Sequence, residues 1–258
     1  MPNLALITGA SSGIGMEFAR YHASRGGDLI ITARSGDKLD ALKAELETAH
    51  RVSVQTIALD LGTPDGAADL AEQVSGQPID ILINNAGFGG HGQHIDRDLV
   101  REQAMIDLNV KALVTLSHNI GQQMALRGSG RILNVGSTAG MMPGPLQAVY
   151  FASKAFVRSY SLALAHELAP KGVTVTVLAP GYVKTGFADV ADLQGTNLVK
   201  SGAATPEQVA RFGYDAMMKG KLHVINDRKL DIALNWIFPL LPLRAVLAGV
   251  YRMQKKQR

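Results

Sequence analysis

The sequence predicts an α/β fold, a single domain with a doubly wound parallel sheet of about seven strands and helices on both faces. Three observations predict it. Short apolar runs alternate with longer amphipathic stretches from residue 4 to residue 178, which is typical of βαβ units with buried strands. A glycine-rich turn joins the first apolar run to the first amphipathic stretch. The 258 residues suffice for one large core, and no linker or break in composition divides them.

The expected strands are short and apolar, and the stretches between them are long enough for helices. We expect strands at 4–8, 29–33, 52–59, 79–84, 131–136 and 173–178, and a seventh at 221–225. We expect helices at about 13–25, 38–49, 64–74, 99–126 and 148–168.

Composition narrows the classes of function. The 26 basic and 22 acidic residues give a net charge of only +4, and no Lys/Arg run occurs before the last four residues, so nucleic-acid binding has little support. The chain has no cysteine, which excludes disulfides and thiol catalysis. The N-terminus lacks the basic start and long apolar stretch of a secretory signal, so we expect a cytoplasmic enzyme.

The turn after the first strand reads Thr-Gly-Ala-Ser-Ser-Gly-Ile-Gly. Gly9 permits a tight turn, Gly13 lets the backbone approach a pyrophosphate, and Gly15 lets the following helix pack close to the strand. The helix N-terminus adds free N–H groups and a positive dipole end. We therefore expect a dinucleotide here, contacted by Gly9, Ser11, Ser12, Gly13, Ile14 and Gly15.

The end of the second strand indicates which dinucleotide binds. A cofactor with a free ribose 2′-hydroxyl requires a carboxylate there, and one with a 2′-phosphate requires a cation. Arg34 follows the strand and no acid precedes Asp37. Because the guanidinium is a planar, always-charged phosphate ligand, we favour NADP(H), with NAD(H) as the alternative.

Tyr150 and Lys154 lie four residues apart, so on a helix they share one face. A phenol has an ordinary pKa of about 10, and we expect an ammonium one turn away to lower it. Such a phenol can transfer a proton to or from a reacting oxygen.

With these residues placed, the chain resembles the short-chain dehydrogenase/reductase family in its common single-domain form, a Rossmann-type domain that here spans 1–258. The resemblance covers about residues 3 to 187. It is carried by Thr8–Gly15, Asp60-Leu61, Asn84-Asn85-Ala86-Gly87, Asn109 in Leu-Asn-Val, Ser137, Tyr150 with Lys154, and Pro180-Gly181 with Thr185.

The resemblance implies further cofactor contacts. Asp60 would hold the adenine amino group and Leu61 would line its pocket. Asp60 could instead cap the following helix, and Asn84 is expected to stabilise the sheet. By the same resemblance, the adenosine and ribose would be contacted by the backbone of Asn85, Ala86 and Gly87. The nicotinamide and its phosphates would be flanked by Pro180, Gly181, Val183 and Thr185.

The resemblance also implies the catalytic roles. Tyr150 would be the general acid in reduction and the base in oxidation, and Lys154 would also bind the nicotinamide ribose. Ser137 would orient the substrate carbonyl. Asn109 would hold a water that connects Lys154 to solvent, although an asparagine inside a helix can be a kink or a core amide. No metal is needed, and His91 with His94 makes an incomplete ligand set.

Two segments late in the chain bear on the substrate. Residues 188–220 follow the sixth strand at the sheet edge where ligands bind, so we expect a lid there. Phe88, Met141, Met142 and Pro143 could line an apolar pocket. The extension 229–258 is apolar and then basic, and its apolar part, 232–243, is too short to span a membrane. It could lie on an anionic membrane surface, although we favour a cover over the chain's own cleft or a subunit interface.

The sequence thus predicts an NADP(H)-dependent oxidoreductase that interconverts a ketone or aldehyde with its alcohol, on a hydrophobic substrate. We expect a homodimer or homotetramer. The alternatives are an NAD-linked alcohol dehydrogenase of the same family and a non-catalytic dinucleotide-binding sensor.

Overall fold

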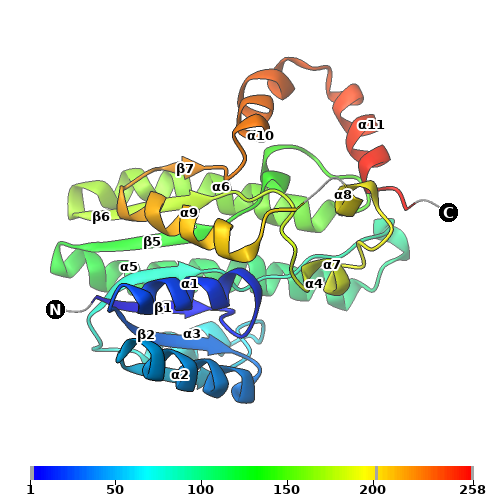
Figure 1. Cartoon of the computed structure of the whole chain (residues 1–258). Helices are drawn as coiled ribbons and strands as arrows, with labels where there is room; N and C mark the ends of the chain where they lie inside the picture. The colour runs from blue at the N-terminus through cyan, green and yellow to red at the C-terminus, as the bar shows by residue number, and fades with distance from the viewer. Residues whose placement is uncertain (1–2, 201–202, 257–258) are drawn as a thin grey trace.

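Seven parallel strands form one sheet in the order β3-β2-β1-β4-β5-β6-β7, as the computed structural model of residues 3–200 and 203–256 shows (Figure 1). This order confirms the predicted doubly wound sheet. The strands are β1 (Leu4–Thr8), β2 (Asp28–Ala33), β3 (Val54–Ala58), β4 (Ile79–Asn84), β5 (Gly130–Val135), β6 (Val173–Leu178) and β7 (His223–Val224).

Both faces of the sheet are buried, because consecutive strand residues point to opposite sides and both sides are apolar. Ala5 and Ile7 of β1 belong to one core cluster, and Leu6 belongs to the other. The direction of strand order reverses between β1 and β4, which opens a crevice beyond their carboxyl ends. The fold therefore places a ligand where β1 and β4 end.

Helices cover the two faces in two layers. On one face lie α1 (Gly13–Ser24), α2 (Gly36–His50) and α9 (Pro206–Met218). On the other lie α3 (Gly66–Gln73), α5 (Leu113–Arg127) and α6 (Ala148–Leu168). These helices carry the buried leucines, valines and aromatics that fill the space against the sheet.

Helix α9 lies inside the segment where the sequence indicated a lid. Thr205 caps it with a reciprocal bond: Thr205 Oγ1 accepts from Gln208 N at 3.2 Å, and Gln208 Oε1 accepts from Thr205 N at 3.3 Å. Its buried face, which includes Tyr214, packs against α1 in the main core. The segment before it contains α7 (Phe187–Val190), whose Phe187 packs against Tyr150, and α8 (Asn197–Lys200); residues 201 and 202 of the predicted lid lie outside the described residues.

The long helix expected at 99–126 is interrupted, which corrects that prediction. It consists of α4 (Leu99–Ile106), a π-helical segment (Asp107–Ala112) and α5. A π turn inserts an extra residue into the helical ladder and is frequent at functional sites. Here the segment carries Asn109.

The C-terminal extension projects from the molecule after β7 and comes back to it beside α8, as Figure 1 shows in orange and red. It runs through α10 (Arg228–Ile232), a π turn (Ala233–Ile237), a 3₁₀ turn (Phe238–Leu240) and α11 (Leu243–Gln254). No helix in the described ranges 3–200 and 203–256 is long and apolar enough to cross a bilayer.

Candidate active site

The ends of β1 and β4 are joined by a compact set of hydrogen bonds. The Thr8 hydroxyl oxygen accepts from the backbone N–H groups of Asn85 and Ala86, both at 3.0 Å. The Asn85 side-chain amide donates back to Thr8 O at 2.9 Å. These bonds hold the Asn85–Gly87 backbone beside the glycine turn, where the sequence placed the cofactor.

The glycine turn needs its glycines for steric reasons. A Cβ on Gly15 would lie 2.3 Å from Gly9 O, and one on Gly9, at φ +67°, would lie 2.9 Å from the Ala86 Cα. Gly13, at φ +57°, faces Thr185, whose Cγ2 would be 3.2 Å from an added Cβ. The turn therefore brings β1, the β4 loop and the start of the lid into contact.

The N-terminus of α1 is suited to an anion. Ser12 occupies the N-cap position, but its side chain accepts no hydrogen bond from the first turn of α1 within the described residues. The first turn also carries no acidic residue. The leading N–H groups and the positive end of the helix dipole are therefore available to a phosphate. This local geometry fits the diphosphate of a dinucleotide.

Arg34 lies at the carboxyl end of β2, exposed to solvent. Its guanidinium makes no hydrogen bond or ion pair with any residue in 3–200 or 203–256. Asp60, also exposed, accepts from Gly62 N at 2.9 Å, and Leu61 is buried in the core against α3 and α5. Leu61 therefore supports the loop from beneath, which sequence reasoning could not distinguish from lining an adenine pocket.

Ser137, Tyr150 and Lys154 meet beyond the end of β5. Ser137 follows that strand, and its Oγ accepts from Ala139 N at 3.1 Å. Tyr150 and Lys154 are both buried on one face of α6, with Lys154 Nζ 5.9 Å from the centroid of the Tyr150 ring. The Lys154 ammonium donates to Val135 O at 2.9 Å. The structure therefore brings the three predicted catalytic side chains together.

Burial governs the ionisation of this group. It raises the pKa of Tyr150 to about 12, and a hydrogen bond with Ser137 offsets part of that rise. It also lowers the pKa of Lys154 to about 8. The expectation of a lowered Tyr150 pKa is wrong for this structure, because the loss of water around the phenol outweighs the hydrogen bond with Ser137.

Asn109 is held by the loop after β4. Its amide donates to Phe88 O at 2.9 Å and to Ser153 Oγ at 3.1 Å, and its Oδ1 accepts from Phe88 N at 3.1 Å. A Cβ on Gly87 would lie 2.8 Å from Asn109 Oδ1 and 3.6 Å from Lys154 Nζ. The side chain of Asn109 thus positions the loop that borders Lys154.

Remaining predicted residues lie at the base of the lid. Pro180 O accepts from Thr138 N at 3.0 Å, which joins the end of β6 to the loop that carries Ser137. Gly181 N donates to Asn226 Oδ1 at 3.3 Å. Val183 is buried and forms an isolated parallel bridge with Ala204.

Tyr150 is covered by side chains that sequence reasoning did not assign to it. The Phe187 ring, from α7, has its centroid 5.4 Å from that of Tyr150, and the Phe151 centroid is 6.2 Å away. Val246 and Val250 of α11 belong to the same buried cluster. Their spacing with Gln254, every fourth residue, is the only sequence signal for this contact.

The end of α11 is fastened at several points. The buried Gln254 accepts from Gln147 Nε2 at 2.6 Å, and Gln254 O lies 2.7 Å from Nε2 of His91. Lys256 pairs with Asp192 of the lid at 2.7 Å. In the described part of the chain no three His, Cys, Asp or Glu residues form a group that could hold a metal. His91 has a visible role as a contact to the C-terminal helix.

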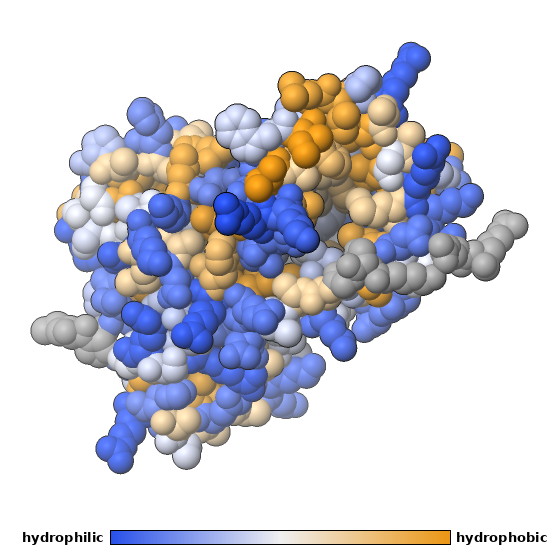
Figure 2. Space-filling view, turned by 45° about the horizontal axis from the view of Figure 1, so that its top comes forward, coloured by the Kyte–Doolittle hydropathy of each residue, from blue (hydrophilic) through white to orange (hydrophobic). Residues whose placement is uncertain are grey.

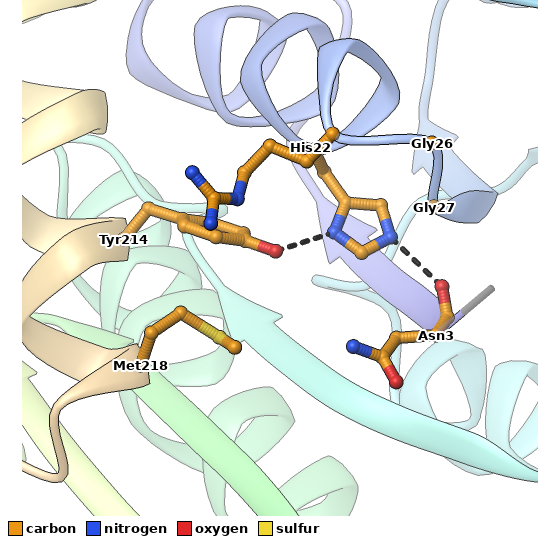
Figure 3. Close-up of a pocket in the computed structure, with 7 residues that line it drawn as sticks. Asn3, His22, Gly26, Gly27, Tyr214 and Met218 are labelled. Atoms are coloured by element: carbon orange, nitrogen blue, oxygen red, sulfur yellow. Dashed lines mark hydrogen bonds between the residues drawn. The ribbon is translucent and has the colours of Figure 1, made fainter. Parts of the chain in front are cut away.

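A second, small polar pocket lies at the amino-terminal end of the sheet (Figure 3). His22 Nε2 lies 3.0 Å from Asn3 O and 3.1 Å from Asp28 O, so it carries the proton. Nδ1 then accepts from the Tyr214 hydroxyl at 2.8 Å. Because both ring nitrogens are bonded and burial lowers the pKa of His22, this histidine joins β1, α1 and α9 as a neutral structural group.

Known proteins resemble this chain over much of its length. The family model for short chain dehydrogenase matches residues 3–194. Sulfoacetaldehyde reductase from Chromohalobacter salexigens is 42% identical over 193 residues, which cover 72% of this chain and 75% of that protein. Very-long-chain 3-oxoacyl-CoA reductase from Macaca fascicularis is 30% identical over 259 residues, covering 98% of this chain and 80% of that protein.

A solved structure agrees with these matches. A short-chain dehydrogenase from Sphingobium yanoikuyae, in complex with NADPH, superimposes with a TM-score of 0.83 at 30% identity, covering 94% of this chain and 97% of that one. The chain belongs to the short chain dehydrogenase family and is an oxidoreductase of the NAD(P)-binding, Rossmann-type fold.

Proposed function

We propose that this protein is an NADP(H)-dependent reductase of a hydrophobic ketone or aldehyde, with Ser137, Tyr150 and Lys154 as its catalytic residues and Asn109 as a positioning residue. The observation that carries the proposal is the buried meeting of a phenol, a hydroxyl and an ammonium next to the β1–β4 crevice. The dinucleotide, when bound, supplies or accepts the hydride.

The chain's own residues supply the proton and the electrostatics. The Ser137 hydroxyl donates to the substrate oxygen and orients the carbonyl. Tyr150, protonated at neutral pH because its pKa is about 12, gives its proton to that oxygen as negative charge develops there. An alkoxide is a much stronger base than a phenolate, so this transfer is downhill. The raised pKa favours the reductive direction, since oxidation would need the phenolate.

Lys154 replaces the proton that Tyr150 loses. With a pKa near 8 it is charged at neutral pH and can release a proton without a large cost. Asn109 holds the loop beside it through the two bonds to Phe88. We assign the relay of protons to solvent to this π-helical region, in which Asn109 would support a bound water.

The preference for NADP(H) is supported by Arg34. Its exposed guanidinium, at the end of β2, is free to pair with a 2′-phosphate. The NADPH-bound relative supports the same choice. Ser11, Ser12 and Ile14 would face the diphosphate, and the backbone of Asn85 to Gly87 would border the ribose.

A hydrophobic substrate is supported by the surroundings of Tyr150. Its cluster contains Phe88, Met142, Phe187 and Phe238, and an apolar groove of about 620 Å³ continues from Met142 and Phe151 to Leu247 of α11. Some very-long-chain 3-oxoacyl-CoA reductases match 98% of this chain, including the extension, whereas others match 72%, as the sulfoacetaldehyde reductases do. We therefore favour an acyl ketone with a long aliphatic chain over a small sulfonate.

Assembly and location stay predictions. The exposed apolar side chains Leu99 and Val100 at the start of α4 support a homodimer or homotetramer, in which they would be covered. The cytoplasmic location expected from the N-terminus is untested.

The test is NADPH consumption, followed by absorbance, with 3-oxoacyl thioesters of increasing chain length and with sulfoacetaldehyde. Turnover should rise with chain length. Tyr150→Phe should lower turnover by at least about 10²-fold while NADPH binding stays intact. Tyr160→Phe, the same change on the same helix, is the matched control. Normal turnover in Tyr150→Phe would refute the catalytic assignment, and NADPH binding without consumption of any carbonyl would favour the sensor alternative.

A further inference from the structure

The C-terminal extension ends in an exposed hydrophobic surface, which we call the apolar tip. It is formed by six large apolar side chains between α10 and the start of α11. Trp236 is 74% exposed, Leu240 84% and Leu243 62%. The other three are Ile232, Ile237 and Leu241. Figure 2 shows this surface as an orange crest at the top of the molecule.

The tip residues are separate from those that pack the extension against the rest of the protein. The inner face of the extension is packed: Leu234 is buried against Ala179 and Ile225, and Val246 belongs to the Tyr150 cluster. Pro239 and Pro242 stop helix formation between the two arms, so the six side chains gather on a projecting turn. Grouped exposed apolar residues on a projection are typical of an interaction surface.

The charge around the tip is predominantly positive. Residues 228–256 contain six basic side chains and a single acid, Asp231, which accepts from Asn235. Lys256 is paired with Asp192. The other five are exposed and make no hydrogen bond or ion pair within the described residues: Arg228, Lys229, Arg244, Arg252 and Lys255.

We propose that the apolar tip docks on the surface of an anionic phospholipid bilayer. Apolar side chains on a turn can enter the headgroup and acyl boundary, while flanking Lys and Arg side chains pair with lipid phosphates. A single tryptophan at the edge of such a surface is typical of the membrane interface. The contact is peripheral, in keeping with the lack of a spanning helix in the described chain.

The tip is continuous with the active site. Phe238, inside the tip's turn, packs in both the Tyr150 cluster and the cluster under β7. Docking would therefore bring the apolar groove lined by Met142, Phe151 and Leu247 towards the lipid phase. The inference goes beyond the proposed reaction and does not depend on it, because binding is measured without turnover.

The experiment uses the only tryptophan in the chain, Trp236, as its probe. Full-length protein is titrated with vesicles of phosphatidylcholine, with or without phosphatidylglycerol. Anionic vesicles should shift Trp236 emission to shorter wavelength, and brominated acyl chains should quench it. Binding should weaken as salt rises from about 0.05 M to about 0.5 M, because the basic side chains are then screened. The proposal would be overturned if Trp236 emission did not change on addition of vesicles, or if the protein bound neutral vesicles as strongly as anionic ones.

A matched pair of variants separates the tip from general hydrophobicity. Leu240 and Leu126 are both 84% exposed, on the tip and at the end of α5 respectively. Leu240→Ser should reduce vesicle partition about tenfold or more, whereas Leu126→Ser should leave it unchanged. Equal losses in both variants would contradict a role of the tip. If Leu240→Ser instead splits an oligomer in size-exclusion chromatography and vesicles do not bind, the tip is a subunit interface and the proposal is wrong.

Discussion

The buried ammonium of Lys154 should cost the fold stability, and Lys154→Met should remove that cost. The side chain lies in the interior beside Tyr150, with Val135 O as its hydrogen-bond acceptor. Methionine keeps an unbranched side chain of similar length and carries no charge. The variant should therefore be inactive but more stable than the natural protein, the pattern expected when a catalytic group is held in an unfavourable environment.

The size of the effect follows from the pKa. A fall from 10.5 to about 8 corresponds to roughly 3 kcal/mol of unfavourable free energy at neutral pH, where the group is charged in both states. The variant also loses the hydrogen bond to Val135 O, which should lower the free energy of unfolding by about 1–2 kcal/mol. The net gain in the free energy of unfolding should therefore be about 1–2 kcal/mol.

The pH dependence has a definite sign. Between pH 8 and 10.5 the folded state has released the Lys154 proton and the unfolded state still holds it, so stability rises with pH. Tyr150 acts in the opposite sense above pH 10, because its folded pKa of about 12 exceeds that of the unfolded chain. The window from pH 7 to 9.5 therefore isolates the lysine.

The assay is urea unfolding without cofactor at several pH values in that window. The natural protein should gain stability towards pH 9.5 relative to Lys154→Met, and the two curves should converge. Lys111→Met, at an exposed position on the π segment, is the control and should lack this effect. If Lys154→Met is less stable at pH 7, or follows the same pH profile as the natural protein, the argument from burial is refuted.

Three further changes test the cofactor site and the extension. Arg34→Asp should shift preference from NADPH towards NADH, measured as the ratio of kcat/KM values, and Lys171→Asp, an exposed charge change at the other end of the sheet, should not; unchanged selectivity would make Arg34 a bystander. Gly15→Ala should abolish NADPH binding in a fluorescence titration, because its Cβ would lie 2.3 Å from a backbone oxygen, whereas Gly249→Ala meets open space and should bind normally; tight binding by the first variant would contradict the packing argument. Gln254→Ala should cost about 1–3 kcal/mol of stability by leaving a buried amide unpaired, and should expose α11 to hydrogen exchange; unchanged exchange there would show that this bond does not fasten the helix.

Local patterns in the sequence were enough to predict the sheet and the glycine turn. The strands are apolar runs bounded by turns, and Gly9 to Gly15 combine spacing with position at the first βα junction. The same level of reasoning missed α9, although Thr-Pro-Glu-Gln at its start is a capping box with proline in the first turn. That signal was present in the sequence and was not used.

Other features depend on contacts between distant parts of the chain. The pKa of Tyr150 is set by burial under Phe187 and by neighbours from α11, which lie far from it in sequence. A Tyr-x-x-x-Lys spacing shows that a lysine is near but not how deeply the tyrosine is buried, so it predicts the wrong direction for the shift of the Tyr150 pKa. Likewise, the packing of Leu61 inward could not be predicted, because a loop leucine has no periodicity to indicate which side it faces.

The extension packs against the proposed active site. The family model ends at residue 194, yet Val246 and Val250 cover Tyr150, and Gln254 binds both the loop before α6 and the loop after β4. The lid is tied to the same helix through the Asp192–Lys256 pair. Movement of α11 would therefore change the groove that Leu247 lines. A bilayer contact at the tip would act on the shape of that groove through this connection, since the same short segment forms both.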